Sequence, residues 1–543
     1  MSNKALSAYI FLLIAAFNLH AKKTIGLLIN SEESSKGYTL FSPNTNYVTY
    51  LIDNDGNLVH SWNSGYKPGL MAYLAPDGYL YRAIVVPGSP PVGSSGGGVE
   101  KLDWQSNVVW HYEIPGSHHD IEVMPSGNVL IIAMETIKRD QAIEAGANPD
   151  FLTGDLLSEY IVEVEPTGSS EGNIVWQWRL WDHLVQNYDP SKGNYGIVRD
   201  HPELIDINAQ TFYQPDFIHL NSIDYNEELD QIALSSRTYS EIWVIDHGTT
   251  TAEAQGHSGG KRGKGGDLLY RWGNPQIYDS GTPEDQILFQ QHDAQWIAEG
   301  VPGSGNMLVF NNGPERGFSS ADEIATPVDS SGNYVLDGSR FGPDELYWSY
   351  SAPNPGDFFA PVISGAQRLP NGNTLICNGP LGKFFEVTPE GEVVWLYINP
   401  VNEYGPARQG DSIVNNVVFK IRRYPPDYPA FSGRDMTPKE PIELAGVTES
   451  VPESGASLYA PGIAKGFAAI SYEIDFPGNV SIKLYNATGQ LVKTLANENK
   501  TSGSYQIDVN ETDFRGRSLE SGVYFIKLET GKTSLTKRIV LVN

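Results

Sequence analysis

HHDIEVMPSGNVLII, residues 118–132, reads as a polar strand start, a hydrophobic strand, a Pro/Gly/Asn turn and a second strand. The same form returns in HLNSIDYNEELDQIALSSR (219–237) and QHDAQWIAEGVPGSGNMLVF (291–310), each opening on or beside a histidine. MAYLAPDGYLYRAIV (71–85) and SGAQRLPNGNTLICNG (364–379) have this form without histidine. Since the chain holds only 11 histidines in 543 residues, their repeated placement predicts side chains that converge on one axis.

A second phrase alternates with the first: a strand, a turn containing Gly or Asn, and a strand that ends near tryptophan. Six tryptophans hold this position, namely Trp62, Trp110, Trp176, Trp272, Trp348 and Trp395. Pairing the two phrases gives units of about four strands, and repetition at roughly 40 residues or more is typical of a β-propeller. The sequence therefore predicts an all-β chain whose main part is a six-bladed β-propeller, with the histidine motifs at one mouth of its central channel.

The two ends of the chain differ from this repeat. Residues 1–21 carry an early lysine and an apolar run, which is typical of a cleaved secretory signal peptide. We assign 22–432 to the propeller, 433–466 to a linker rich in Pro, Glu and Ser, and 467–543 to a small antiparallel β-sandwich. No later stretch approaches the ~20 apolar residues of a membrane span, so none is expected. Cys377 is the single cysteine and cannot form an internal disulfide.

The charge balance limits the classes of partner. With 37 basic and 65 acidic residues the formal net charge is -28. Such a chain repels nucleic acid and anionic membranes at long range, so we expect neither as a partner. An anionic substrate would need a local positive pocket that works against this field.

Candidate binding residues are His118, His119, His219, His292 and Arg316, the last lying after the strand that pairs with that of His292. Imidazole and guanidinium donors in an acidic chain favour an anionic guest. Three histidines from separate strands also match a catalytic zinc site, so a metal-dependent hydrolase stays open as an alternative. A nearby arginine disfavours a bound cation, and we predict neither a metal nor another cofactor.

Aspartates recur after the histidine motifs, and a basic loop lies farther along the chain. We expect Asp120, Asp224 and Asp293 to serve the geometry of the repeat, because a carboxylate can cap free amides at a strand start. The glycine-rich segment GGKRGKGG (259–266) is interpreted as a solvated loop, with a lid over an anionic ligand as the alternative.

Residues 26–432 resemble the bacterial arylsulfotransferases (aryl-sulfate sulfotransferases). The matching phrases include LIDNDGNLVHSW, HHDIEVMPSGNVL, FIHLNSIDY with ALSSR, LLYRWGNP, QQHDAQWI, VFNNGPER and AQRLPNGNTLIC. The resemblance implies a six-bladed propeller that transfers a sulfuryl group between phenols without a nucleotide donor, through a transiently sulfated histidine. It assigns His219, His292 and Arg316 to sulfate binding, and we predict these three as the catalytic residues. We predict His118, His119, Asn221 and Lys383 as substrate-binding residues. The resemblance also places the nucleophilic histidine in the last blade, where this chain has Lys383.

The tail resembles the C-terminal sorting domain of the type IX secretion system of Bacteroidota. SIKLYNATGQLVKTL, LESGVYFIKLETG and the closing TKRIVLVN carry this resemblance. It implies passage through the periplasm, interaction with the type IX machinery, and a secreted or cell-surface location.

These observations predict an exported enzyme that moves a sulfuryl group from a small aromatic sulfate ester to a phenol. The alternative is a propeller that binds an anionic or sulfated ligand without catalysis, because no histidine occurs in residues 293–543.

Overall fold

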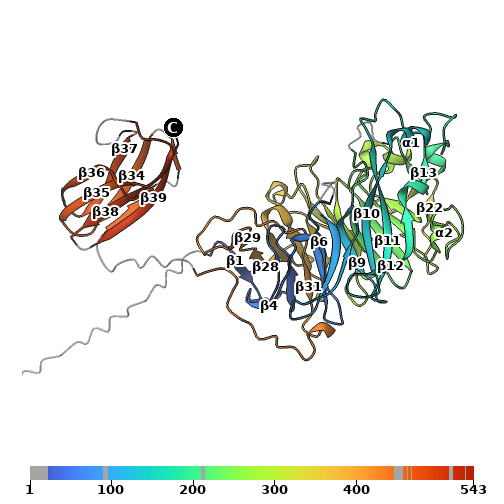
Figure 1. Cartoon of the computed structure of the whole chain (residues 1–543), viewed down its shortest axis with the longest axis horizontal. Helices are drawn as coiled ribbons and strands as arrows, with labels where there is room; N and C mark the ends of the chain where they lie inside the picture. Colours follow the sequence, from blue (N-terminus) through green and yellow to red (C-terminus); the bar gives the residue numbers. More distant parts are fainter. Residues whose placement is uncertain are drawn as a thin grey trace, which may run out of the picture. The chain divides into compact units, whose positions relative to one another are not determined.

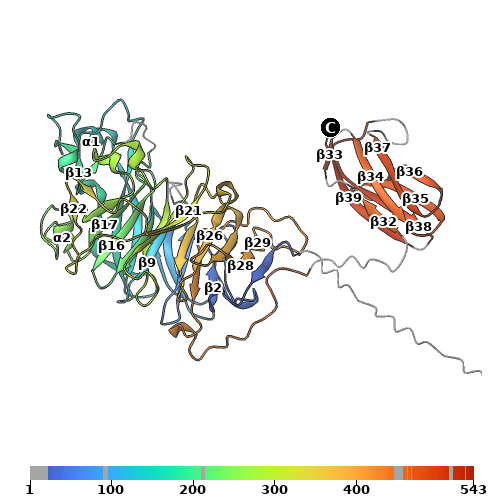
Figure 2. The same ribbon diagram turned by 180° about the vertical axis from the view of Figure 1, so that it is seen from behind.

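The computed structural model describes residues 23–89, 96–209, 215–445, 456–460, 463–465, 467–510, 512, 518–531 and 533–542. The predicted signal peptide, residues 1–21, lies outside the described residues. The chain divides into two compact units, Met1–Gly446 and Val447–Asn543. Figures 1 and 2 show the strand-rich ribbon of each unit.

Six antiparallel sheets of four or five strands make up the described part of the first unit, together with three two-stranded pairs. Each sheet is built from strands that follow one another along the chain. In two sheets, one further strand comes from the opposite end of the unit. The predicted all-β class and the four-stranded antiparallel units are thus confirmed. The six tryptophans of the second phrase each lie on the fourth strand of one sheet, where they end the unit as the sequence predicts.

The sheets are numbered along the chain, and the first strand of each is called its inner strand. Sheet 1 holds β31 (Arg422–Tyr424), β2 (Tyr38–Phe41), β3 (Val48–Ile52) and β4 (Leu58–Asn63). Sheet 2 holds β5 (Pro68–Leu74), β6 (Leu80–Val85), β7 (Gly97–Leu102) and β8 (Val108–Glu113). Sheet 3 holds β9 (Ser117–Val123), β10 (Val129–Ile137), β11 (Leu156–Pro166) and β12 (Gly172–Arg179).

Sheet 4 holds β15 (Leu220–Asn226), β16 (Gln231–Ser236), β17 (Glu241–Asp246) and β18 (Tyr270–Trp272). Sheet 5 holds β19 (His292–Trp296), β20 (Met307–Asn311), β21 (Ser320–Ile324) and β24 (Trp348–Tyr350). Sheet 6 holds β25 (Gly365–Arg368), β26 (Thr374–Asn378), β27 (Lys383–Val387), β28 (Val393–Ile398) and β1 (Gly26–Asn30). The small pairs are β13 (Leu184–Val185) with β14 (Ile205–Asp206), β22 (Leu336–Asp337) with β23 (Arg340–Phe341), and β29 (Val401–Asn402) with β30 (Gly405–Pro406). The two α-helices are α1 (Arg139–Glu144) and α2 (Thr251–Ala254).

Recurring aspartates join the inner strand of one sheet to the next. Asp120 accepts a hydrogen bond from Ile223 N on β15, and Asp224 accepts one from Trp296 N on β19. Asp293 accepts one from Ala366 N on β25. The expected structural role of these residues therefore has a clear geometry: each carboxylate satisfies an amide of the following sheet.

The two ends of the first unit close the series of sheets. β31 pairs with β2 and β1 pairs with β28, so segments almost 400 residues apart share sheets 1 and 6. Gln367 on β25 exchanges hydrogen bonds with the backbone of Arg423 on β31. The Tyr424 hydroxyl receives Leu74 N of β5 at 2.9 Å. The inner strands therefore form a closed cycle of neighbours.

A buried ion network lies between the inner strands. Lys420 Nζ lies 2.7 Å from Asp120 Oδ2 and 2.7 Å from Asp293 Oδ1. Arg422 also bonds both carboxylate oxygens of Asp293. Burial alone would raise the pKa of Asp293, but Arg422 and Lys420 outweigh it and lower that pKa to about 2.

Replacing Lys420 by methionine should destabilise the first unit by about 3–5 kcal/mol, because it leaves two buried carboxylates without their shared cation. Lys439, an exposed lysine of the same unit, provides the control variant Lys439→Met. Thermal and urea unfolding of the two variants beside the wild type measure the effect. Equal stability of the two variants would contradict a structural role for the network.

The second unit is built from two sheets. β32 (Ala456–Tyr459), β34 (Phe467–Ile474) and β37 (Gly503–Asn510) form the first. β33 (Ile463–Lys465), β39 (Ser534–Val542), β38 (Gly522–Thr530), β35 (Gly478–Asn486) and β36 (Leu491–Lys500) form the second. Buried aliphatic side chains from both sheets form one core, among them Ile470, Ile482, Ile526 and Leu528.

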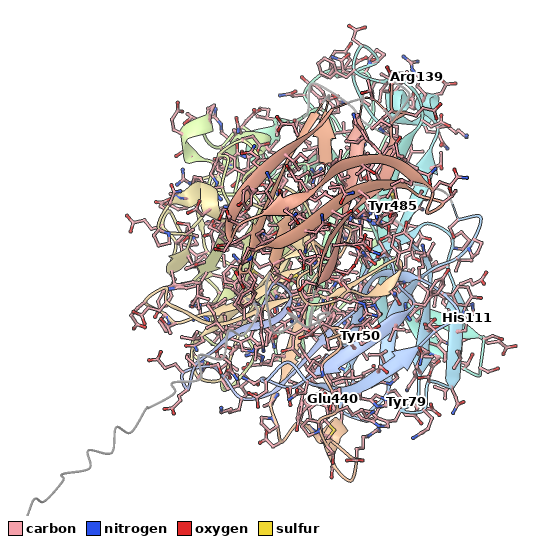
Figure 3. All side chains as sticks on the ribbon, turned by 90° about the vertical axis from the view of Figure 1, so that its left-hand side faces the viewer. Tyr50, Tyr79, His111, Arg139, Glu440 and Tyr485 are labelled. Atoms are coloured by element: carbon pink, nitrogen blue, oxygen red, sulfur yellow. The ribbon has the colours of Figure 1, made fainter. Side chains whose placement is uncertain are left out.

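Parts of the stretch predicted as a linker, 433–466, belong to the two units themselves. Lys439 N donates to Leu58 O, and the buried side chain of Ile442 packs in the core beside β28, so this part returns to the first unit. Figure 3 labels Tyr50 on β3 and Glu440 in the returning segment. β32 and β33 fall within the same predicted stretch and belong to the second unit. No helix among the described residues is long and apolar enough to cross a bilayer.

Candidate active site

The starts of the inner strands have an uncommon backbone. His119 and His219 both have φ 57°, and Asp293 has φ 56°, in the left-handed region that non-glycine residues rarely adopt. The strand pairing shifts register at the same points, in β9, β15 and β19. Bulges of this kind re-aim side chains, and backbone strain gathers at functional sites. The repeated geometry therefore marks these strand starts as a candidate site.

The four predicted histidines lie close together. His118 Nδ1 and His119 Nδ1 are 2.7 Å apart, so one ring donates a hydrogen bond to the other. The ring centroids of His119 and His219 are 4.6 Å apart. The ring of Phe419 lies 5.9 Å from that of His119 and 6.2 Å from that of His292. Histidines from sheets 3, 4 and 5 are thus brought together around one phenylalanine.

Different hydrogen-bond partners distinguish His219 from His292. His219 Nδ1 lies 2.6 Å from the carboxylate oxygen Asp216 Oδ2. His292 Nδ1 lies 2.7 Å from Asn312 Oδ1. The Asn312 amide nitrogen donates to the carbonyls of Ala360 and Ile363, which leaves its oxygen facing the ring. His292 Nδ1 must then carry a proton, so in the neutral ring the lone pair resides on Nε2.

Burial keeps most of the histidine group neutral. Burial lowers the pKa of His118 and His292 to about 3 and that of His119 well below its usual value. Neighbouring charges and hydrogen bonds have smaller effects on each pKa. Burial therefore disfavours the charged form of these three rings. At neutral pH they offer hydrogen bonds and lone pairs.

Arg237 supplies the positive charge beside the histidines. Its charge disfavours protonation of His119 and His292. Burial would raise the pKa of Asp216, but the hydrogen bond with His219 outweighs it, and Arg237 adds to the lowering. Arg237 and His219 line one cavity of about 720 Å³, together with Asp216, Gln290 and other polar residues. Sequence reasoning missed Arg237, although it closes the ALSSR phrase and lies where the second strand of the His219 repeat ends.

Arg316, Asn221 and Lys383 have other surroundings. The Arg316 guanidinium stacks between Phe289 and Phe318 and donates to Asn311 O and Ser320 Oγ. Asn221 is buried and donates to Gln291 O at 2.7 Å, which ties sheet 4 to the residue before His292.

Lys383 lies at the start of β27, with Nζ 5.3 Å from the centroid of Phe385. The structure thus joins the predicted histidines and Asn221 in one region, whereas Arg316 and Lys383 contact other groups.

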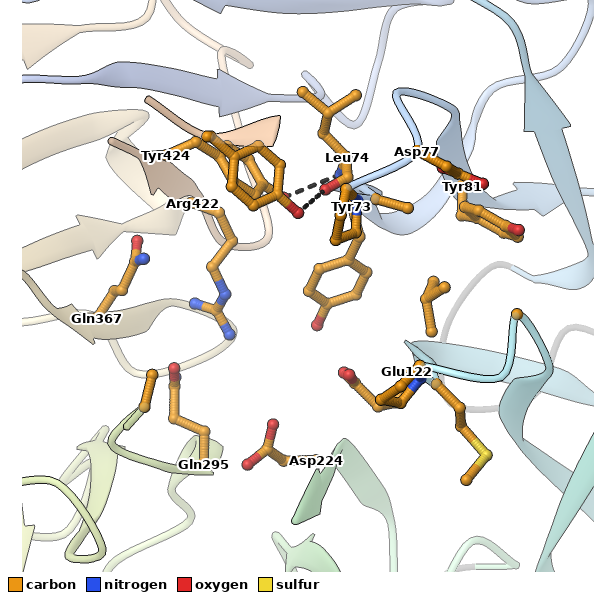
Figure 4. Close-up of a pocket in the computed structure, with 18 of the residues that line it drawn as sticks. Tyr73, Leu74, Asp77, Tyr81, Glu122, Asp224, Gln295, Gln367, Arg422 and Tyr424 are labelled. Carbon is orange, nitrogen blue, oxygen red and sulfur yellow. Dashed lines mark hydrogen bonds between the residues drawn. The ribbon is translucent and has the colours of Figure 1, made fainter. Parts of the chain in front are cut away.

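A second cavity of about 580 Å³ adjoins the opposite, C-terminal ends of the inner strands. Figure 4 shows the carboxyl groups of Glu122 and Asp224 facing Arg422 and Tyr73 across it. Burial raises the pKa of Asp224 to about 7 and that of Glu122 well above its usual value. A carboxyl pair that is partly protonated and lined by aromatic rings suits a neutral or weakly polar guest better than an anion.

The zinc alternative can be compared with the distances between side chains. Among the described residues, one group of three or more His, Cys, Asp or Glu side chains has its ligand atoms near enough to hold an ion: His183, His257 and Asp267. The four histidines at the inner strand starts do not form such a group.

Two family models match the chain. The model described as Arylsulfotransferase (ASST) matches residues 93–399, and the model described as Secretion system C-terminal sorting domain matches residues 463–542. The sorting domain marks a secreted or cell-surface protein that engages the type IX secretion machinery. No curated protein is significantly similar in sequence.

Several solved structures are similar at low identity. A protein of unknown function from Bacteroides caccae is 12% identical, with a TM-score of 0.39, over 72% of this chain and 99% of its own. Hydrazine synthase of Kuenenia stuttgartiensis is 14% identical, with a TM-score of 0.33, over 55% of this chain and 71% of its own. Virginiamycin B lyase of Staphylococcus aureus is 10% identical, with a TM-score of 0.32, over 69% and 85%. Since the Arylsulfotransferase (ASST) model spans more than half of the sequence, the chain belongs to the arylsulfotransferase family and ends in a type IX secretion sorting domain.

Proposed function

We propose that the six sheets are the blades of a six-bladed β-propeller, and that the chain transfers a sulfuryl group from a phenolic sulfate ester to a phenol without a nucleotide donor. The observation that carries this proposal is that histidines from three sheets gather near one guanidinium, Arg237, which lines a cavity with His219 and disfavours protonation of His119 and His292. Family membership supports the reaction class.

Arg237 suits the nonbridging oxygens of a sulfate ester. A guanidinium offers planar, paired donors that match two oxygens of a tetrahedral anion. In a chain of net charge -28, this local charge is what lets an anion approach the cavity. Transfer of such a group has a loose transition state, so charge stabilisation and positioning carry most of the catalysis.

The partners of the two central histidines assign them different roles. The Asp216 carboxylate, 2.6 Å from His219 Nδ1, orients that ring and leaves Nε2 as the atom to exchange a proton with the substrate. An amide partner and burial keep His292 neutral with a lone pair on Nε2. We therefore assign His292 as the sulfuryl acceptor and His219 as the proton carrier, in place of a histidine at the Lys383 position.

The reaction balances in two steps. His292 Nε2 forms a bond to sulfur while the bond from sulfur to the phenolic oxygen breaks, and the electron pair leaves on that oxygen, which takes a proton from His219. In the second step the acceptor phenol gives its proton to His219 and its oxygen attacks sulfur. The N–S bond then breaks and its electron pair returns to Nε2.

The alternative function is binding of an anionic or sulfated ligand without turnover. The burial of His292, which is 2% exposed, favours it, because an acceptor nitrogen must be reached by the donor. Calorimetry that detects 4-nitrophenyl sulfate bound in the Arg237 cavity, with no product released, would select this function.

The direct test uses purified protein with 4-nitrophenyl sulfate as donor and phenol as acceptor. We expect nitrophenol release that depends on phenol, together with formation of phenyl sulfate. Nitrophenol release that is unchanged when phenol is left out would indicate hydrolysis and contradict the transfer reaction. Absence of release at any phenol concentration would contradict catalysis altogether.

A further inference from the structure

Two insertions between the repeats meet at the group formed by His183, His257 and Asp267. His183 Nδ1 and His257 Nδ1 each lie 2.8 Å from Asp267 Oδ1. The three ligand atoms lie within 4.8 Å of one another. His183 follows sheet 3, whereas His257 and Asp267 belong to the connection between β17 and β18 of sheet 4. The group lies outside the histidine cluster assigned to catalysis.

The two ring nitrogens of His183 have different partners. Its Nε2 lies 2.9 Å from the carbonyl oxygen of Ala254, which can only accept, so Nε2 carries the proton. Nδ1, the other ring nitrogen, lies 2.8 Å from Asp267 Oδ1. Both groups are buried, His183 completely. An imidazole that donates one N–H to a carbonyl and directs its other nitrogen into a group of possible ligands is arranged as metal-bound histidines usually are.

Rigid packing holds His183 in this orientation. Its ring stacks on Trp178 with the centroids 5.6 Å apart and the planes 2° from parallel. Trp178 Nε1 donates to Gly266 O at 2.7 Å. A β-carbon at Gly266 would lie 2.6 Å from His183 Nε2, so only glycine fits between the ring and the loop. The residue preceding Asp267 is thus fitted to this one histidine.

His257 provides the adaptable side of the group. Its side chain is 60% exposed, in contrast to 6% for Asp267. Ligand atoms of a tetrahedral zinc ion, with bonds of about 2.0–2.1 Å, lie roughly 3.3–3.4 Å apart. The two pairs at 2.8 Å would need to widen by about half an ångström, which is a small adjustment for side chains of this kind.

We propose that His183, His257 and Asp267 bind one transition-metal ion of the zinc class, with solvent in the fourth position. Two imidazoles and one carboxylate favour zinc over calcium or magnesium, which prefer sets of oxygen ligands. The ion joins the segment after sheet 3 to helix α2 and the glycine-rich loop 259–266. Lys261 and Arg262 of that loop bond Asp230, Asp246 and Leu229 O, so these two residues hold the loop against sheet 4.

The test is zinc binding by the purified protein after treatment with a chelator. His257→Ala removes an exposed ligand with little risk to folding. His201→Ala is the matched control, because His201 is 42% exposed at its side chain and pairs with a carboxylate, Glu203, in the same way. We expect calorimetry to show one zinc ion per chain for the wild type and His201→Ala, and at least about 100-fold weaker binding for His257→Ala. Zinc should raise the Tm of the first two proteins only.

Two results would overturn the proposal. One is a wild-type protein that binds no zinc, which would mean that the three side chains form only a hydrogen-bonded structural cluster. The other is zinc binding by His257→Ala as tight as that of the wild type, which would place the ion elsewhere, with the inner-strand histidines as the next group to examine. Neither outcome depends on sulfuryl transfer, so the metal site and the proposed activity are tested separately.

Discussion

Replacing His292 by asparagine should lower kcat/KM for sulfuryl transfer by about 10⁴-fold or more, the scale seen when a covalent nucleophile is removed. Asparagine removes the Nε2 lone pair but keeps a polar side chain beside Asn312. Because His292 is buried, with a strong hydrogen bond, circular dichroism and Tm must show that the variant still folds. Initial rates with 4-nitrophenyl sulfate and phenol measure the effect.

A covalent adduct provides the second measurement for His292. Wild-type protein quenched during turnover should carry one SO₃ group on the peptide that contains His292. His111→Asn, on β8 and paired with Glu113 at the surface, serves as the control and should keep full activity. An adduct on His219 with a small effect of His292→Asn would exchange the two roles.

Replacing Arg237 by alanine should lower kcat/KM by about 10³-fold, because the variant loses the charge that faces the nonbridging oxygens. Arg237→Lys should recover part of this loss, since lysine keeps the charge without the paired donors. The loss is expected in both kcat and KM, because the donor is negatively charged in the ground state as well. Steady-state kinetics across donor concentrations separate the two parameters.

Arg316→Ala is the informative comparison for Arg237. The resemblance to the arylsulfotransferases assigns sulfate binding to Arg316, whereas the structure places that guanidinium between Phe289 and Phe318. We expect Arg316→Ala to cost far less activity than Arg237→Ala at equal Tm. A larger effect of Arg316→Ala would restore the assignment made from sequence.

The sequence predicts the repeats well because each repeat carries local signals. Tryptophan at the fourth strand, Pro/Gly/Asn turns and alternating apolar residues all occur within one repeat of about 40 residues, so a short stretch of sequence is enough to recognise them. The histidines at the strand starts could be grouped for the same reason. Arg237 carries no such signal: it follows the second strand of its repeat, and its approach to His119 and His292 depends on how three sheets face one another.

Protonation could not be predicted from the sequence at all. In the sequence, His118 and His219 occupy similar positions in their repeats. In the structure His118 is buried beside His119, whereas His219 bonds Asp216 at the cavity wall. Similarly, Lys420 appears as an ordinary lysine in VFKIRRY, and its pairing with Asp120 and Asp293 spans residues far apart in the chain. Such contacts require the complete tertiary structure.

The pairing of β31 with β2 sets the order in which this exported chain matures. Residues 38–63 lack the neighbouring inner strand until residues 422–424 arrive, so the first segment made must wait for the last segment of its unit. Contacts over such long separations form late and slowly. The sorting domain begins at residue 463, after β31, so the address for outer-membrane passage is translated only once the closing strand exists. A chain truncated before residue 422 should therefore lack both a closed ring of sheets and the signal for release.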